Sequence, residues 1–370
     1  MSRLHAIYHL QASAADIDAR ARALALEQSI EMPLEAVASE HVRRDIVATV
    51  ESINEIAPGR FAVVLGIATA TTGGEIGQTM NMLFGNCSLQ DDVELVDVGL
   101  PDDFLVGFAG PRFGLEGIRE CVGGAGRALT MTALKPQGLS AADLGRLCGV
   151  FAGAGIDIVK DDHGIANQAY APFAARVAAC QQAVRRANAQ TGGRSVYAPS
   201  LSGGPRQVRE QLRIVREEGV GMVLACPMLM GLAHFQEMVG HDLEVPVLAH
   251  PALAGAARIH PPLLLGRLFR LLGADATIFP NYGGRFSYSR EACEALAHAA
   301  RAPWRDFRAT APVPAGGMNV GRVPEMLEVY GRDVILLIGG ALLSAGSALA
   351  ARSREFADSV RTLSQRSEVT

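Results

Sequence analysis

Short apolar runs alternate with longer amphipathic segments through the last two thirds of the chain. From about Arg127 onward, each run is rich in Val, Ile and Ala, and each is followed by a segment with the apolar spacing of a helix. This alternation is typical of repeated βα units around a parallel sheet. The eight runs cover residues 128–136, 156–163, 194–200, 221–227, 245–251, 274–280, 309–317 and 334–340. Eight such units in series predict a closed (β/α)₈ TIM barrel rather than an open sheet.

The first part of the chain has a different pattern. Residues 15–29 have helical apolar spacing, whereas residues 45–56 and 60–68 resemble two paired strands. We therefore expect an N-terminal α+β domain over residues 1–124, followed by the barrel over residues 125–370. The last stretch, residues 353–367, predicts an amphipathic helix that closes the barrel.

Composition narrows the classes of partner. The formal net charge is -4 and the charged residues are scattered, so the chain lacks the basic stripe that would bind a nucleic-acid backbone. The six cysteines form no CxxC pair, and the amino terminus has no secretory pattern, which predicts a reducing, cytoplasmic location. Apolar stretches are interrupted before they could cross a hydrocarbon core of roughly 30 Å, so no membrane span is expected.

Polar residues gather where the apolar runs end. They are Lys135, Lys160 to His163, Ser200, His250, Asn281, Gly316 with Gly317, and Gly339 with Gly340. The carboxyl ends of the strands form the active face of such barrels, while the strand interiors are filled with packed apolar side chains. The sequence therefore places its charge where it can be used in chemistry.

Lys160, Asp161, Asp162 and His163 end the second run. Alternate strand residues point to one side, so Lys160 and Asp162 face the same way and His163 begins the loop. This cluster is either a catalytic group or an ion pair on a solvated rim. Lys135 ends the neighbouring run, and two close lysines lower each other's affinity for protons. A neutral amine would suit proton transfer or reaction with carbon dioxide.

Two glycine pairs and one histidine complete the candidate site. Gly316 with Gly317 and Gly339 with Gly340 end the last two runs, where barrels often bind phosphate through backbone N–H groups. Tight turns are the alternative explanation for these pairs. His250 ends the fifth run, so it is either a structural residue or an active-site residue.

At these positions the sequence resembles the RuBisCO large-subunit superfamily. LKPQGLS at residues 134–140 resembles the family's TIKPKLGLS segment, and GIDIVKDDH at residues 155–163 resembles its metal motif ending KDDE. LLIGGALLS at residues 336–344 resembles its FGGG phosphate loop. The likeness extends to residues 110–120 and to LFGNCSL at residues 83–89, so it covers most of the chain.

The resemblance implies a role for each candidate residue. Lys160 would be carbamylated by carbon dioxide and would bind Mg²⁺ together with Asp162, because a carbamate offers the oxygen that this cation prefers. Lys135 would move protons and His250 would lie in the active site. Asn86 would reach in from the amino-terminal domain of a neighbouring subunit, which implies a homodimer. Gly317, Gly339 and Gly340 would match the family's phosphate-binding glycines, and Gly316 joins them as the first residue of its pair.

Several positions depart from the family pattern. His163 stands where the family has a glutamate ligand, so a softer divalent ion than Mg²⁺ becomes plausible as the bound metal. Gln137 replaces a second lysine, and Thr69 replaces a glutamate. Pro251 replaces an arginine that grips a second phosphate, and Arg285, in the loop after the sixth run, replaces the lysine that steadies the incoming carboxylate. We therefore expect an enzyme that is not a ribulose bisphosphate carboxylase.

Three functions fit this pattern. The first is a lyase or hydrolase that acts through a metal-stabilised enolate on a small phosphorylated sugar acid, such as 3-oxo-isoapionate 4-phosphate in apionate catabolism. The second is an enolase or isomerase of a methylthio-sugar phosphate in methionine salvage. Met228, Leu229 and Met230 could line an apolar pocket for its thiomethyl group, or they could belong to the core. The third is a non-catalytic binding or regulatory relative.

Overall fold

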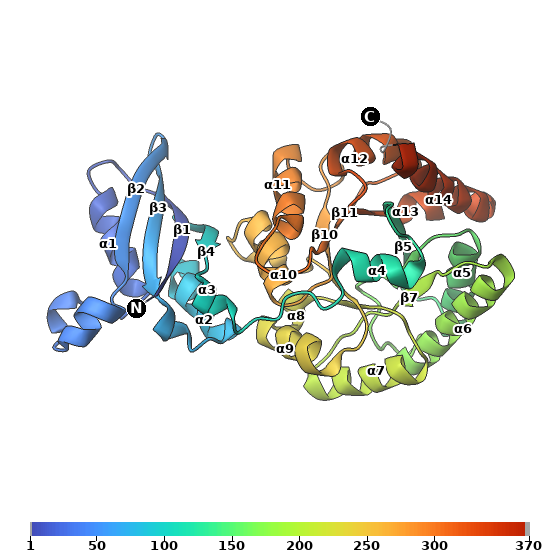
Figure 1. Cartoon of the computed structure of the whole chain (residues 1–370), viewed down its shortest axis with the longest axis horizontal. Coiled ribbons are helices and arrows are strands. Elements are labelled where there is room, and N and C mark those ends of the chain that lie inside the picture. The colour runs from blue at the N-terminus through green and yellow to red at the C-terminus, as the bar shows by residue number, and fades with distance from the viewer. Residues whose placement is uncertain (1, 367–370) are drawn as a thin grey trace. The chain divides into compact units, whose positions relative to one another are not determined.

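The computed structural model describes residues 2–366, which divide into two compact units (Figure 1). The N-terminal unit contains the chain up to Phe108 and also Leu253–Leu264. The barrel unit contains Ala109–Ala252 and the chain from Leu265 onward. The division thus falls after Phe108 rather than at the expected residue 124, because helix α4 (Gly114–Val122) packs its apolar face into the barrel.

The N-terminal unit is built around an antiparallel sheet with the strand order β2-β3-β1-β4. Its elements are β1 (Arg3–Gln11), α1 (Ile17–Glu27), β2 (Thr49–Ala57), β3 (Arg60–Ala68), α2 (Ile76–Phe84), β4 (Val93–Gly99) and α3 (Asp102–Leu105). The expected helix and the expected strand pair are therefore present. Sequence analysis missed β1 and β4. On β1 the alternate residues Leu4, Ala6, Tyr8 and Leu10 are fully buried, which is the strand period of two.

Eight parallel strands form the wall of the barrel unit. They are β5 (Leu129–Leu134), β6 (Ile158–Asp161), β7 (Val196–Ala198), β8 (Val223–Ala225), β9 (Val247–Ala249), β10 (Ala276–Pro280), β11 (Ala311–Ala315) and β12 (Ile335–Leu337). Hydrogen bonds join them in the orders β12-β5-β6-β7 and β8-β9-β10-β11. A parallel bridge between Ser200 and Leu224 links β7 to β8, and β11 lies beside β12, so the ring closes. Each strand lies inside one of the eight predicted runs, which confirms the TIM barrel.

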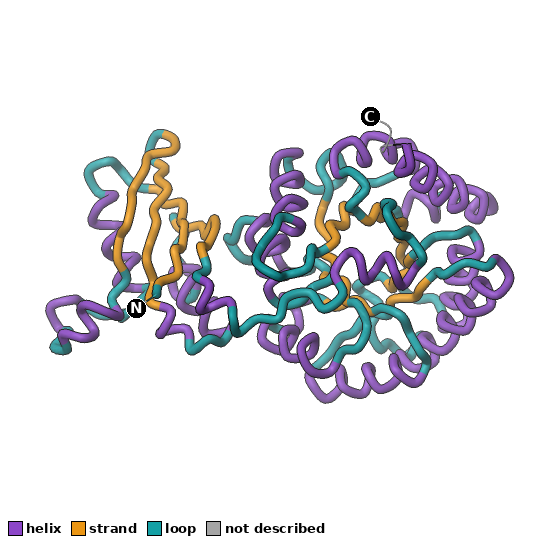
Figure 2. The backbone as a smooth tube through the Cα atoms, viewed as in Figure 1, coloured by secondary structure: helices purple, strands orange, loops and turns teal. Residues whose placement is uncertain are grey.

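Helices surround the strands, as Figure 2 shows. They are α5 (Ala141–Gly153), α6 (Phe173–Thr191), α7 (Pro205–Glu217), α8 (Pro227–Met230), α9 (Leu232–Glu237), α10 (Phe269–Leu271), α11 (Arg290–Arg301), α12 (Val323–Tyr330), α13 (Gly340–Leu343) and α14 (Leu349–Arg366). The Ser140 hydroxyl caps α5 by accepting from Asp143 N at 3.2 Å, and Ser289 caps α11 in the same way. The predicted last helix is α14, which packs against α5, α12 and β5; Ser367, its expected last residue, is outside the described residues.

The barrel interior is a packed core of alternate strand residues. Examples are Leu129 and Met131 on β5, Ile158 on β6, and Leu248 just before the end of β9. Leu115, Ile118 and Val122 of α4 join this core from the amino-terminal end of the barrel. This end is therefore plugged by a helix. The next inward-facing layer, at the carboxyl ends of the strands, contains the polar residues.

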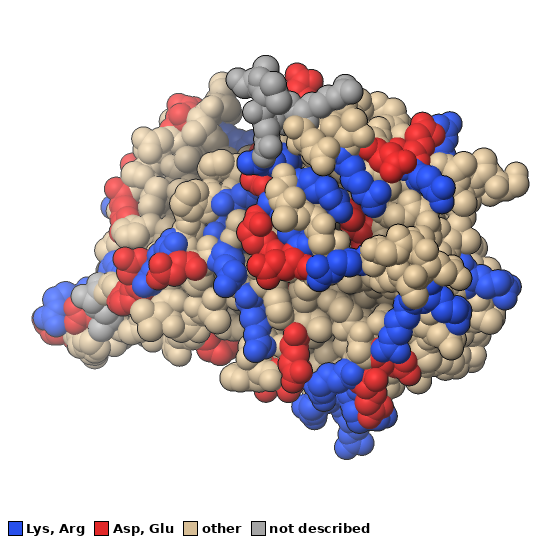
Figure 3. All heavy atoms as spheres, turned by 45° about the vertical axis from the view of Figure 1, so that its right-hand side comes forward, with Lys and Arg blue, Asp and Glu red and all other residues tan. Residues whose placement is uncertain are grey.

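The surface carries charges of both signs. On the face drawn in Figure 3, basic and acidic side chains lie next to one another. On α7, for example, Arg213 forms ion pairs with Glu210 and Glu217. That face therefore shows no continuous basic stripe. Among residues 2–366, no helix combines the length and the apolar character that a membrane span requires.

Candidate active site

The inward-facing row of β5 and that of β6 both end in charged residues. On β5 the row runs through Met131 and Ala133 to Lys135, and on β6 it runs from Ile158 to Lys160 and Asp162. Leu134 and Asp161 are register partners, so the next residues, Lys135 and Asp162, lie opposite each other. The strands themselves therefore bring two lysines and one carboxylate together at the carboxyl end of the barrel.

Lys135 and Asp162 form a close ion pair. The Lys135 Nζ atom donates to Asp162 Oδ1 at 2.6 Å, and the Lys135 side chain is 34% exposed. Burial raises the pKa of Asp162, but hydrogen bonds from His163 and Lys135 outweigh it and hold that pKa well below its ordinary value. Asp162 is thus a carboxylate at neutral pH, with Lys135 accessible beside it.

Lys160 is in a different state. Its amine is buried, and its hydrogen bond goes to the main-chain oxygen of Asp161 at 3.0 Å rather than to a carboxylate. Burial lowers the pKa of Lys160 to about 8; the Asp162 carboxylate opposes this shift, and the Lys135 charge adds to it. The partly neutral amine expected from two neighbouring lysines is therefore Lys160. The sequence left a Lys160–Asp162 ion pair as the alternative. In the structure, Asp162 pairs with Lys135 instead.

His250 and His163 stack on each other. Their ring centroids are 4.0 Å apart with an interplanar angle of 14°, and His163 Nδ1 lies 3.4 Å from Asp162 Oδ1. Burial, with the charge of Lys160 next in weight, lowers the pKa of His250 to about 2. The His250 Nδ1 atom accepts from Ala252 N at 3.1 Å. His250 is therefore a neutral imidazole whose proton is on Nε2, available to a bound oxygen.

Cys226 belongs to the same layer, and sequence analysis missed it. It follows Met222 and Leu224 at alternate positions of β8, and it is 6% exposed. Burial raises the pKa of its thiol to about 11, while the charge of Lys160 works in the opposite direction. Cys226 is therefore a neutral thiol in the layer that holds Lys160. Following the alternate positions Met222, Leu224 and Cys226 within the run 221–227 would have found it.

Three other strand-end polar residues have structural roles instead. Asp161 faces the helices, where it accepts from Arg176 Nε at 3.0 Å, Tyr197 Oη at 2.7 Å and Ser200 N at 3.0 Å. Asn281 is buried, and its Oδ1 atom accepts from Tyr330 Oη at 2.6 Å. Asp161, Ser200 and Asn281 thus anchor the wall of the barrel.

The glycine pairs lie at the ends of β11 and β12. Gly339 is so close to Lys135 that a methyl group on Gly339 would stand 3.9 Å from Lys135 Cε. Gly316 and Gly317 have φ angles of +83° and +91°, which favour glycine. A Cβ on Gly317 would stand 2.6 Å from the Cα atom of Gly284, in the loop after β10. Gly316 and Gly317 thus form a tight turn, and Gly339 borders the lysine site. The phosphate-binding role of the two glycine pairs stays a prediction.

Arg285 and Asn86 lie on other segments. Arg285 is exposed in the loop after β10, with its guanidinium 5.2 Å from the centre of the Phe286 ring. Asn86 belongs to the N-terminal unit, where its amide donates to Glu27 at 3.0 Å and to Glu31 at 2.9 Å. The expected role of Asn86 in a neighbouring subunit's site stays a prediction.

The residues at the ends of β5 and β6 fit a divalent cation. Lys160 offers a buried amine that is partly neutral near pH 8, the form that reacts with carbon dioxide. Asp162 offers an ionised carboxylate, and His163 Nδ1 lies on the same side. Two oxygen ligands and one imidazole nitrogen bind Mg²⁺ less selectively than three oxygen ligands would. This set also accepts softer divalent ions. The carbamate on Lys160 and the identity of the ion stay predictions.

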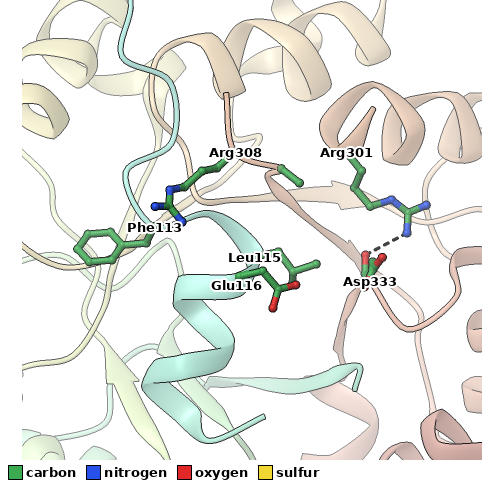
Figure 4. Close-up of a pocket in the computed structure, with 7 residues that line it drawn as sticks. Phe113, Leu115, Glu116, Arg301, Arg308 and Asp333 are labelled. Atoms are coloured by element: carbon green, nitrogen blue, oxygen red, sulfur yellow. Dashed lines mark hydrogen bonds between the residues drawn. The ribbon is translucent and has the colours of Figure 1, made fainter. Parts of the chain in front are cut away.

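A separate pocket of about 270 Å³ lies at the opposite end of the barrel (Figure 4). It is lined by residues of α4 and of the segments that precede β11 and β12, among them Glu116, Arg308 and Asp333. Arg301 donates to the main-chain oxygen of Asp333 at 3.0 Å, the dashed line in Figure 4. In TIM barrels the amino-terminal end contributes to stability and the carboxyl end to catalysis. We therefore place the candidate site at Lys135, Lys160, Asp162 and His250.

Comparison with known proteins agrees with this architecture. Residues 114–277 match the family described as ribulose bisphosphate carboxylase large chain, catalytic domain. The chain is 52% identical over 359 residues to 5-methylthioribulose-1-phosphate isomerase from Rhodospirillum rubrum, covering 97% of this chain and 96% of that protein. It is 32% identical to 2,3-diketo-5-methylthiopentyl-1-phosphate enolase from Geobacillus thermodenitrificans, covering 88% and 84% of the two chains.

A solved structure extends the likeness to three dimensions. The crystal structure of a Rubisco-like protein from Rhodopseudomonas palustris superposes with a TM-score of 0.92 at 51% identity, and the match covers 98% of both chains. These relatives carry the names of isomerases, enolases and Rubisco-like proteins rather than carboxylases. The chain belongs to the RuBisCO large-chain family, and within it to the RuBisCO-like proteins that are not true carboxylases.

Proposed function

We propose that this chain is an isomerase of a methylthio-sugar phosphate such as 5-methylthioribulose 1-phosphate, and that it works by proton transfer through an enolate. The observation that carries this proposal is the Lys135–Asp162 pair at 2.6 Å, next to the buried Lys160 amine and the neutral His250. The name of the Rhodospirillum rubrum relative supports the substrate class. The comparisons thus favour the methionine-salvage hypothesis over the apionate hypothesis.

The reaction requires a proton to leave one carbon and return to its neighbour. A base removes the proton next to the carbonyl, the C–H electron pair becomes a C=C bond, and the carbonyl oxygen becomes an enolate. The hydroxyl proton of the first carbon then moves to the former carbonyl oxygen, and the base delivers its proton to the former carbonyl carbon. The carbonyl is thereby re-formed on the neighbouring carbon, and no carbon is lost. Lys135 is the accessible amine that exchanges this proton, and Asp162 holds it in place at 2.6 Å. His250 Nε2–H donates to the oxygen on which charge develops.

A divalent cation would assist the same step. Lys160 as a carbamate, Asp162 and His163 would hold it, and the cation would polarise the substrate carbonyl. Asp162 would then have two roles, because the same carboxylate holds Lys135 and contributes to the cation site. The glycines beside Lys135 would take the phosphate, because Gly339 has no side chain to block an oxygen from the backbone N–H groups.

The thiomethyl end of the substrate requires an apolar contact. Met228, Leu229 and Met230 form α8, directly after Cys226 at the end of β8. The structure contradicts their assignment to the core, because Leu229 is 59% exposed and both methionines are partly exposed. We infer that α8 contacts the thiomethyl group, since flexible methionine side chains adapt well to a thioether.

The test is turnover of 5-methylthioribulose 1-phosphate by the purified chain in deuterated water with Mg²⁺ and bicarbonate. We expect an isomeric product in the ³¹P and ¹³C spectra, with deuterium at the carbon that receives the proton and no carbon dioxide released. Lys135→Met should abolish both turnover and deuterium uptake. The proposal would be overturned by turnover of 3-oxo-isoapionate 4-phosphate with loss of a carbon fragment and no conversion of the methylthio substrate.

Leu229→Asp is the matched specificity variant. Because Leu229 is exposed, its replacement should leave the fold intact and should raise KM for the methylthio substrate at least tenfold, which corresponds to about 1.4 kcal/mol of lost contact. Ile56→Asp on β2 of the N-terminal unit is the control, because Ile56 is 48% exposed and lies on a different unit. Equal effects of the two changes would remove α8 from the substrate site.

We further infer that the active form is a homodimer to which Asn86 contributes across the subunits. The test mixes two inactive variants, Asn86→Ala and Lys160→Met, after reversible dissociation. If each site takes residues from both subunits, a mixed dimer has one intact site, and activity should recover to about a quarter of the wild-type level. No recovery, with hybrid dimers shown by mass spectrometry, would place Asn86 outside the site.

A further inference from the structure

A second group of metal-ligating side chains lies in the N-terminal unit, away from the residues assigned to catalysis. His9 is on β1, Glu94 is on β4, and His260 is in the segment Leu253–Leu264 that returns to this unit (Figure 1). His9 and Glu94 are directly opposed in the antiparallel β1–β4 pair. The His260 backbone N–H donates to Leu95 O at 2.9 Å, so the third residue is fixed beside the same strand.

The three side chains point at one another. Each offers one ligand atom, and these atoms lie within 4.8 Å of one another. His260 Nε2 is 3.6 Å from Glu94 Oε2, and His9 Nδ1 is 3.9 Å from the same oxygen. With metal–ligand bonds of about 2.0–2.1 Å, ligand atoms in a tetrahedral site are about 3.3 Å apart. The two imidazole nitrogens are therefore within a few tenths of an ångström of that distance from Glu94 Oε2. The two histidines have to approach each other from a separation of at most 4.8 Å, which side-chain rotation allows.

Arg60 shows that a cation is already accommodated here. Its Nη2 atom donates to Glu94 Oε2 at 2.7 Å and to His9 Nδ1 at 3.0 Å. Since a guanidinium has no acceptor, His9 Nδ1 must offer a lone pair, which is the form of imidazole that binds metals. Burial, followed by the charge of Arg60, lowers the pKa of His9. The Arg60 side chain is 42% exposed, so it can turn into solvent.

We propose that His9, Glu94 and His260 bind a divalent transition-metal ion of the Zn²⁺ class, with Arg60 as the competing cation. Two imidazoles and one carboxylate, with an open fourth position, form a common zinc ligand set. Imidazole ligands favour such ions over Mg²⁺. This site is independent of the proposed isomerase function, because it shares no residue with the barrel site. The ion would join β1, β4 and the returning segment within the N-terminal unit.

The test is Co²⁺ binding to the full chain after removal of metals with a chelator. The barrel site is first disabled by Lys160→Met and Asp162→Asn, so that any remaining binding reports on the N-terminal unit. In this background we expect one Co²⁺ per chain, with the intense visible absorption of a four-coordinate ion, displaced by Zn²⁺. His9→Gln and His260→Gln should each weaken binding at least about 100-fold and remove the visible bands.

Arg60 and His5 provide the matched controls. Arg60→Gln should strengthen Co²⁺ binding several-fold, because the competing cation is removed. His5→Gln should leave it unchanged, because His5 also lies on β1 but is exposed and pairs with Glu51 instead. Zn²⁺ should also raise the unfolding temperature of the background protein and not that of the two histidine variants.

Two results would overturn the proposal. The first is Co²⁺ affinity and spectra that are unchanged by both His9→Gln and His260→Gln in folded protein, as judged by circular dichroism. The second is weaker binding in Arg60→Gln, which would mean that Arg60 supports the cluster rather than competing with the ion. Should either histidine variant fail to fold, Glu94→Gln, which changes the charge and keeps the shape, provides the same comparison.

Discussion

Replacing Lys160 with methionine should abolish activity and at the same time stabilise the barrel. The amine is buried, and its pKa of about 8 lies below the ordinary value of 10.5. One pKa unit corresponds to about 1.4 kcal/mol. The protonated amine is therefore about 3 kcal/mol less favourable in the folded chain than in the unfolded chain. Methionine has a similar length and no charge, so it removes this penalty.

Part of the gain is lost again at the main-chain oxygen of Asp161, which loses the hydrogen bond from Lys160 Nζ at 3.0 Å, at a cost of about 1 kcal/mol. The attraction between Lys160 and Asp162 is already contained in the pKa shift of Lys160, and Asp162 keeps Lys135 at 2.6 Å. We therefore expect a net stabilisation of roughly 2 kcal/mol at pH 7, which for a domain of this size is roughly 5 °C in unfolding temperature. The measurement is calorimetric unfolding in chelator and carbon-dioxide-free buffer, where the amine stays unmodified.

The pH dependence follows from the same shift. Because the pKa of Lys160 is lower in the folded chain, the unfolded chain binds more protons between about pH 8 and 10.5, and stability rises with pH through that window. The advantage of Lys160→Met should be complete below pH 8 and should vanish by about pH 10.5. The reasoning is refuted if Lys160→Met is less stable than the wild type at pH 7, or if the difference is independent of pH.

Lys135→Met is the control, and it should change the free energy of unfolding in the opposite direction. Lys135 is partly exposed and is the nearest partner of Asp162, so its removal leaves a nearly buried carboxylate without its main ion pair. We expect this variant to lose activity and also to lose stability, by about 1–3 kcal/mol. Two lysines at neighbouring strand ends thus give opposite changes in stability, which a general effect of losing one positive charge would not produce.

Three further predictions concern other residues of the barrel. His250 should remain neutral with its proton on Nε2 between about pH 5 and 8, as ¹⁵N NMR of the imidazole would show, because burial holds its pKa at about 2; a protonated ring in that range would remove its proposed donor role. Asp161→Asn should lower the free energy of unfolding by about 3–5 kcal/mol in urea titrations, since the fully buried Arg176 loses its carboxylate, and wild-type stability would contradict this. Gly339→Ala should raise KM with little change in unfolding temperature. Gly317→Ala should lower both stability and kcat, because the φ of Gly317 is +91° and Gly284 Cα stands 2.6 Å from the added Cβ. Identical behaviour of the two variants would refute this distinction.

The sequence predicted the barrel well because parallel strands buried on both faces form near-continuous apolar runs. It missed β1 and β4, although the alternate burial of Leu4, Ala6 and Tyr8 is visible as a period of two once the strand is known. The return of Leu253–Leu264 to the N-terminal unit has no local signal, because it depends on long-range contacts such as Leu95 N to Arg258 O at 3.0 Å.

The pairing inside the candidate site was only partly predictable. Alternation along one strand placed Lys160 and Asp162 on the same side, which suggested that these two would interact. Register between strands decides the actual contact, because Leu134 is opposite Asp161 and the following pair is therefore Lys135 with Asp162. Sequence spacing within one strand cannot supply that register, so the partner of Asp162 required the structure.

The order of strands around the barrel gives the strongest argument for the kind of substrate. The glycine pairs follow β11 and β12, whereas the apolar α8 follows β8, and the strand order puts β8 on the opposite side of the ring from β12. The proton-transfer residues at the ends of β5, β6 and β9 lie between these two sides. A ligand that spans the mouth would thus meet glycines at one end and methionine and leucine side chains at the other. Pro251 provides no charge that could bind a second phosphate. This arrangement therefore matches a molecule that has one phosphate end, one apolar end and a carbonyl between them. It matches a sugar acid that is polar throughout less well.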